Sequence, residues 1–164
     1  MIRRLNQDHA KPYRALMLEA YELHPDAFTS TVAERSALPE KWWSQRLSDD
    51  SSASELVMGA FVGNELAGVT GLTLETREKT RHKATLFGMY VPLKFRQYGF
   101  GRQLVNAVLH QARACPDIRI LKLTVTEGNV AAQRLYESVG FVRFGLEPFA
   151  VRVGDSFVSK VHMW

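Results

Sequence analysis

Apolar residues recur along the 164-residue chain at two different spacings, and the spacing changes near residue 55. Between Tyr13 and Tyr21 they recur at three- and four-residue steps, which is typical of one helical face. We therefore expect a strand over Ile2 to Leu5 and a helix from an N-cap at Asp8 to about Leu23, ended by His24-Pro25. A second helical region follows and is interrupted or restarted at Pro39.

The middle of the chain has the shorter, β-type pattern. A polar segment from Ser48 to Glu55 reads as a connecting loop. The strands expected after it are Leu56 to Val62, Leu66 to Glu75 and Ala84 to Val91, joined by a turn at Gly63-Asn64 and a charged connection over Thr76 to Lys83. An antiparallel meander is the simplest arrangement of these three strands.

In the last third of the chain, helical patterns alternate with β-type patterns. The strand ending at Val91 is followed by a helix with Leu104 and Val108 on its apolar side, and then by a strand over Ile120 to Val125, which is a βαβ unit. A short helix closed by Gly140 and a final hairpin follow, with strands over Phe141 to Val153 and Phe157 to Trp164. We therefore expect an α/β fold of the α+β type, in a single domain of residues 1–164.

Composition agrees with one packed domain. Apolar residues make up 46% and charged residues 23% of the chain, which excludes a disordered protein, and the lone Cys115 excludes a disulfide scaffold. No stretch has the length and apolarity of a signal peptide or a membrane span, so we expect a cytoplasmic protein without a membrane partner. The net charge of +4 favours anionic partners in general, and no pattern indicates nucleic-acid binding.

The strongest local motif lies between the third strand and the following helix, over Arg96 to Arg102. Gly99 and Gly101 leave room for a ligand beside the backbone, and the free N–H groups of a helix start bind anions such as a pyrophosphate. The lysine-containing loop of ATP-dependent enzymes is absent, and Leu104 stands where a dinucleotide fingerprint has a third glycine.

At this motif the chain resembles the GNAT superfamily of acyl-CoA-dependent N-acyltransferases. The superfamily pattern of Arg or Gln, two residues, Gly, one residue, and Gly or Ala is met by Arg96, Gly99 and Gly101. A second block of the superfamily is met from Leu121 to Phe141. The resemblance implies a mixed sheet of about seven strands and about four helices, with a central parallel pair that splays apart.

The resemblance also implies a set of functional residues. Acetyl-CoA would be the co-substrate, with no metal, and Tyr136 would act as the general acid. The positions that would bind the cofactor are Met89, Tyr90 and Val91 for the pantetheine arm, Arg96, Gln97, Tyr98, Gly99, Phe100, Gly101 and Arg102 for the pyrophosphate, and Asn129 near the reactive end. The sequence thus predicts transfer of an acetyl group to an amine.

Several assignments have more than one candidate. The strand segment from His82 to Val91 lacks the glutamate that many relatives carry, so the general base is Glu75, His82, Glu127 or an ordered-water relay. Phe28 and Glu75 are candidates for binding the acceptor, which is a small-molecule or peptide amine. A non-catalytic acyl-CoA sensor of the same fold is the alternative function, and the protein is a monomer or a homodimer.

Overall fold

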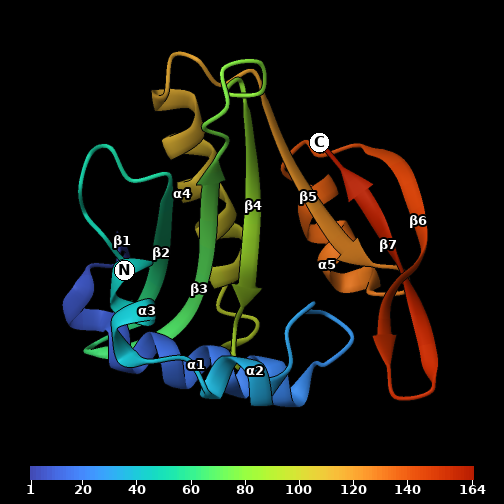
Figure 1. The fold of residues 1–164 in the computed structure, drawn as a ribbon, viewed down its shortest axis with the longest axis horizontal. Coiled ribbons are helices and arrows are strands. Elements are labelled where there is room, and N and C mark those ends of the chain that lie inside the picture. Colours follow the sequence, from blue (N-terminus) through green and yellow to red (C-terminus); the bar gives the residue numbers. More distant parts are fainter.

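The computed structural model describes residues 1–164 as one seven-stranded sheet with helices on both faces (Figure 1). The strand order is β1-β2-β3-β4-β5-β7-β6, and β4 and β5 are the parallel pair. The strands are β1 (Ile2–Arg4), β2 (Glu55–Val62), β3 (Glu65–Leu74), β4 (Lys83–Tyr90), β5 (Ile120–Thr126), β6 (Arg143–Val153) and β7 (Ser156–Met163). The predicted mixed sheet is confirmed.

Five α-helices accompany the sheet, and two 3₁₀ turns lie at Gln7–His9 and Leu93–Phe95. The helices are α1 (Ala10–Leu23), α2 (Val32–Ser36), α3 (Glu40–Gln45), α4 (Phe100–Ala114) and α5 (Val130–Glu137). None of them combines the length and the apolar composition that crossing a membrane requires.

Each face of the sheet has its own core. Successive side chains of a strand point to opposite faces, so Met58 and Ala60 of β2 pack in the cluster that contains α4, while Val57 packs in the cluster that contains α1. Strand β2 reads as a nearly continuous apolar run because both of its faces are covered.

Two details of the N-terminal half differ from the sequence predictions. Asp8 does not cap α1, because Gln7–His9 forms a 3₁₀ turn capped by Asn6, and α1 begins after it at Ala10. The second helical region forms two short helices. The first begins in a capping box that the sequence reading missed, in which Glu34 N donates to Thr31 Oγ1 at 3.1 Å.

Candidate active site

The sheet opens in its centre, between β4 and β5. These strands pair only from Lys83–Ile120 to Thr85–Lys122, and from Leu123 onward β5 pairs with β7 on its other side. Figure 1 shows the two strands diverging toward the end of the sheet where α1 and α2 lie. Beyond Thr85, the edge of β4 that faces β5 therefore has no strand partner. We call this space the open gap.

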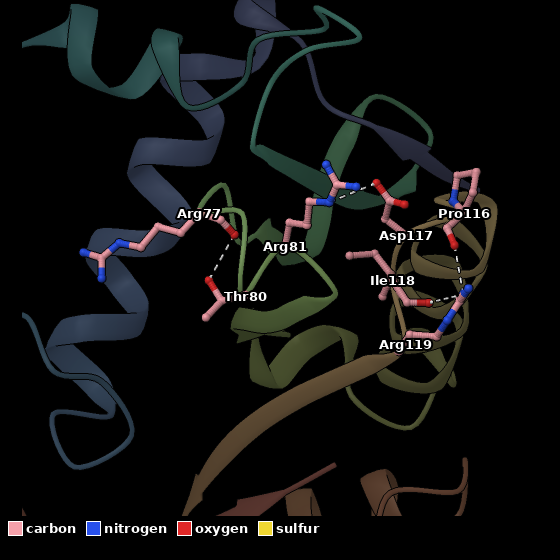
Figure 2. Close-up of polar contacts among 7 residues, drawn as sticks. All are labelled: Arg77, Thr80, Arg81, Pro116, Asp117, Ile118 and Arg119. Carbon is pink, nitrogen blue, oxygen red and sulfur yellow. Dashed lines mark hydrogen bonds and ion pairs between the residues drawn. The ribbon is translucent and has the colours of Figure 1, made fainter.

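The opposite end of the gap is closed by contacts between two loops. Figure 2 shows Arg81 of the β3–β4 loop reaching Asp117 of the α4–β5 loop, with 3.7 Å between Nε and Oδ2. Nearby, the backbone N–H of Arg119 donates to His82 O at 2.8 Å. These contacts hold the first residues of β4 and β5 together, so the strands separate only at their carboxyl ends.

Glu75 and His82 lie at this closed end. Glu75 N donates to Lys83 O at the start of β4. A strand rises about 3.3 Å per residue, so both side chains are roughly 20 Å from Tyr90 at the other end of β4. The structure does not bring either residue together with the rest of the candidate site, because the chain reverses at the end where the sheet is closed.

The end of β4 is reshaped by a bulge. Gly88 has a positive φ of 61°, and the β3–β4 register shifts between Val69 and Gly71. After the bulge, Val91 N makes no hydrogen bond within the protein, while Val91 O accepts one from Arg96 Nε at 3.2 Å. The Val91 N–H is thus a free donor at the mouth of the gap.

Six consecutive backbone N–H groups follow, from Gln97 to Arg102, and none of them has an acceptor within the protein. We call this segment the phosphate loop. Gln97 and Gly99 have positive φ values of 70° and 74°, and Gly99 is the N-cap of α4. A row of unpaired N–H groups at the start of a long helix favours an anion, which fits the predicted pyrophosphate.

Two of the positively charged side chains near this loop already contact other side chains of the protein. Lys94 is paired with Glu65, and Arg96 reaches His24 with 3.2 Å between Nη2 and Nε2. Gly101 also has a packing role, because an added Cβ would lie 3.1 Å from Leu135 of α5. The backbone donors are therefore the feature of the loop that most favours an anion.

Tyr136 of α5 is buried in the core on the α4 side of the sheet, edge-to-face with Phe141 at 5.9 Å between ring centroids. Its hydroxyl makes no hydrogen bond with another protein group. Burial raises the pKa of Tyr136 to about 12, so the phenol stays protonated throughout the physiological range. It is a hydrogen-bond donor without a partner.

Asn129 follows the end of β5 and is the N-cap of α5. Its Oδ1 accepts a hydrogen bond from Ala132 N at 3.2 Å, which leaves the two donors of Nδ2 uncommitted. Glu127 lies two residues earlier, with an exposed side chain. Of the three base candidates, only Glu127 lies at the open end of the gap.

A buried lysine holds the loop between α1 and α2 over the end of β5, and the sequence patterns did not predict it. Lys160 of β7 donates to Asp26 O, Ala27 O and Thr126 Oγ1 at 3.2, 3.1 and 2.8 Å. Burial lowers the pKa of Lys160. The same loop carries Phe28, which lines a cavity of about 250 Å³ on the α1 face, so the lysine fixes one wall of that cavity.

The comparisons with known proteins agree with this geometry. The chain matches the acetyltransferase (GNAT) family over residues 17–141 and belongs to that family. Its structure superposes with a TM-score of 0.88 on a GNAT-family acetyltransferase from Streptococcus pneumoniae, at 25% identity over 99% of this chain and 96% of that one. A putative acetyltransferase from Salmonella typhimurium, solved with acetyl-CoA, superposes at 0.81 with 18% identity over 99% and 91% of the two chains.

Two curated relatives are similar in sequence over shorter segments. A [ribosomal protein bS18]-alanine N-acetyltransferase from Haemophilus ducreyi is 41% identical over 59 residues, which is 36% of this chain and 40% of the relative. N-alpha-acetyltransferase 40 from Saccharomyces cerevisiae is 34% identical over 95 residues, or 53% and 33% of the two chains. The chain thus matches less than half the length of either relative.

Proposed function

We propose that the protein is an N-acetyltransferase that transfers the acetyl group of acetyl-CoA directly to a primary amine. The observation that carries this proposal is the combination of an open gap in the sheet with six unpaired N–H groups beside it. The edge of β4 would hold the pantetheine arm as an added strand, through Met89, Tyr90 and Val91. The phosphate loop would bind the pyrophosphate.

The chain supplies two donors for the reaction itself. Val91 N–H would stabilise the negative charge that develops on the thioester oxygen when the amine attacks. The Tyr136 hydroxyl would donate to the departing sulfur. Its pKa of about 12 exceeds that of a free thiol, about 8.5, so it would act by a hydrogen bond in the transition state rather than by full proton transfer.

Asn129 would contact the reactive end of acetyl-CoA through Nδ2, while its Oδ1 keeps α5 capped. The amine must lose a proton before or during attack, and a lysine-like amine with a pKa of about 10.4 is mostly protonated at pH 7. Glu127 or ordered water at the open end would accept that proton, because Glu75 and His82 lie at the closed end.

Two measurements test the proposal. Calorimetry should show saturable binding of acetyl-CoA, and a thiol-release assay with a panel of amines should show turnover. Asn129→Asp preserves the cap oxygen but removes the Nδ2 donors, so it separates a role in binding from a role in folding. Absence of acetyl-CoA binding would refute the proposal.

A second function is favoured by one observation, the lack of a carboxylate on β4. The protein would then be an acyl-CoA-binding sensor of the same fold. Binding of acetyl-CoA without acetylation of any amine in the panel would support the sensor and contradict the enzyme.

A further inference from the structure

The cavity of about 250 Å³ on the α1 face borders the part of β4 that comes just before the residues assigned to the pantetheine arm of acetyl-CoA. Phe87 and Gly88 line it from β4, and Phe28 lines it from the α1–α2 loop. Gly88 immediately precedes Met89 and lies in the bulge at the open gap. A molecule bound in this cavity would therefore lie against β4 next to the segment assigned to the pantetheine arm, which makes the cavity the candidate acceptor site if the proposed function holds.

Two arginine side chains also line the cavity. Arg35 comes from α2, and Arg46 comes from the C-terminal end of α3. The Arg35 guanidinium lies 4.7 Å from the ring centroid of Trp42, and the Arg46 guanidinium lies 4.6 Å from that of Phe87. Stacking on aromatic faces fixes the guanidinium planes and leaves their N–H edges available to a ligand.

The charge of these arginines is only partly balanced. Arg46 Nε lies 3.3 Å from Glu55 Oε2, an ion pair whose angles do not make a hydrogen bond. Arg35 has no carboxylate within ion-pair distance, and its Nε is buried without a hydrogen bond. No acidic residue lines the cavity. The two guanidinium groups therefore bring positive charge to a cavity lining of which Glu55 balances only part, so the cavity favours an anionic group.

Two phenols add neutral donors to the same cavity. Tyr13 and Tyr21 both line it, and burial raises the pKa of each hydroxyl, so neither carries a negative charge that would balance the arginines. Their rings, with those of Phe28 and Phe87, form an aromatic wall, and Met17, Thr29, Ser30 and Thr73 complete the side-chain lining. The cavity thus joins a positively charged corner to an aromatic wall, at a size suited to a small molecule.

We propose that the acceptor is a small amine that also carries an acidic group, such as an α-amino acid, and that Arg35 and Arg46 bind this acidic group while the amine faces Gly88. This assignment rests on the proposed function. Polyamines and other polycationic acceptors fit poorly, because they bring further positive charge to the arginines. The α-amine of a peptide has no adjacent carboxylate, since the first residue's carbonyl is an amide.

The test compares α-amino acids with the corresponding α-amino amides, measured as kcat/KM for thiol release at saturating acetyl-CoA. Each pair has the same side chain and amine and differs in the acidic group. We expect the acids to react at least about tenfold faster, since a hydrogen bond to a charged group has that effect. In Arg35→Gln this preference should fall about tenfold, and Arg35→Lys should keep part of it.

The matched control is Arg77→Gln, which removes the same charge at the closed end of the sheet, where the Arg77 guanidinium points away from the other residues drawn in Figure 2. It should keep the full preference. Binding of N-acetylated amino acids and amides to the wild-type protein gives a second readout that needs no turnover, and the acids should bind more tightly.

Different results would contradict the assignment of the acceptor and the acetyltransferase function. Equal rates or affinities for acids and amides, or faster acetylation of peptides, would overturn the assignment of the acceptor and leave the acetyltransferase intact. A protein that fails to bind acetyl-CoA in a parallel calorimetric titration would overturn both.

Discussion

Replacement of Tyr136 by Phe tests the proposed chemistry without disturbing the fold. The aromatic ring is buried on the α4 side of the sheet, and the hydroxyl has no hydrogen-bond partner within the protein, so its removal leaves no protein group unpaired. We expect the free energy of unfolding to stay within about 1 kcal/mol of wild type, or to rise slightly. Loss of activity in Tyr136→Phe would therefore not come from loss of structure.

The pKa of Tyr136 decides whether its hydroxyl transfers a proton or donates a hydrogen bond, and this sets the expected loss of kcat in Tyr136→Phe. Full transfer of a proton from a phenol with a pKa of about 12 to a thiolate whose acid has a pKa of about 8.5 is uphill by roughly 3.5 units, or about 5 kcal/mol. A hydrogen bond to the developing thiolate has no such penalty and contributes about 1.5 to 3 kcal/mol. Tyr136→Phe should therefore lower kcat by roughly 10- to 150-fold.

The assay is the rate of thiol release between pH 7 and 10, measured beside calorimetric binding of acetyl-CoA and urea unfolding. Over this range the phenol of the wild type stays protonated, so the ratio of the two rates should not change with pH. An unchanged kcat in Tyr136→Phe across the range would refute the role of the hydroxyl. So would a loss of stability above about 2 kcal/mol, which would mean that the hydroxyl has a structural partner.

Three further outcomes are expected. Asn129→Ala should lower the free energy of unfolding by about 1 kcal/mol, and Asn129→Asp should not, because only the aspartate keeps an oxygen that accepts from Ala132 N. Equal losses for the two variants in urea unfolding would contradict the capping role. Gly101→Val should lower the free energy of unfolding by about 1 to 3 kcal/mol, because the added side chain contacts Leu135. The further change Leu135→Ala should restore part of this stability. A double mutant that is no more stable than Gly101→Val would contradict this packing. Burial raises the pKa of Tyr136 to about 12, and burial together with the hydrogen bond to Glu19 raises the pKa of Tyr90 to about 12. The folded protein therefore ionises these residues later than the unfolded chain does, so the free energy of unfolding should be unaffected by them up to about pH 10 and fall between about pH 10 and 12. Constant stability over that range would contradict these environments of the two phenols.

Most of the fold could be predicted because local patterns specify it. The βαβ unit and the final hairpin follow from apolar spacing and from Gly140 and Gly154, whose positive φ values of 104° and 61° mark a helix end and a turn. The errors lie where side chains compete locally. Asn6 caps a 3₁₀ turn ahead of Asp8, and a Thr31–Glu34 capping box starts a helix within a region without clear apolar spacing.

The candidate site divides in the same way. The phosphate loop is contiguous in sequence, so its motif could be recognised directly. The cavity proposed for the acceptor could not, because Arg35 and Arg46 line it only once α2 and α3 fold against α1, and no spacing connects these residues. Lys160 had a weak signal as a lysine within an apolar strand, but its acceptors at Asp26 and Ala27 are more than 130 positions away in the chain.

The central claim is that acetyl-CoA binds in the open gap, with its pyrophosphate on the phosphate loop. The most direct measurement is a titration with acetyl-CoA followed by NMR of the backbone amides. If acetyl-CoA binds in the gap, the chemical shifts of the amides should change saturably, most of all at Gln97 to Arg102 and at Met89 to Val91. Amides at the closed end, such as that of Arg119, should show almost no change. Absence of saturable shifts, or shifts centred away from the gap, would contradict it.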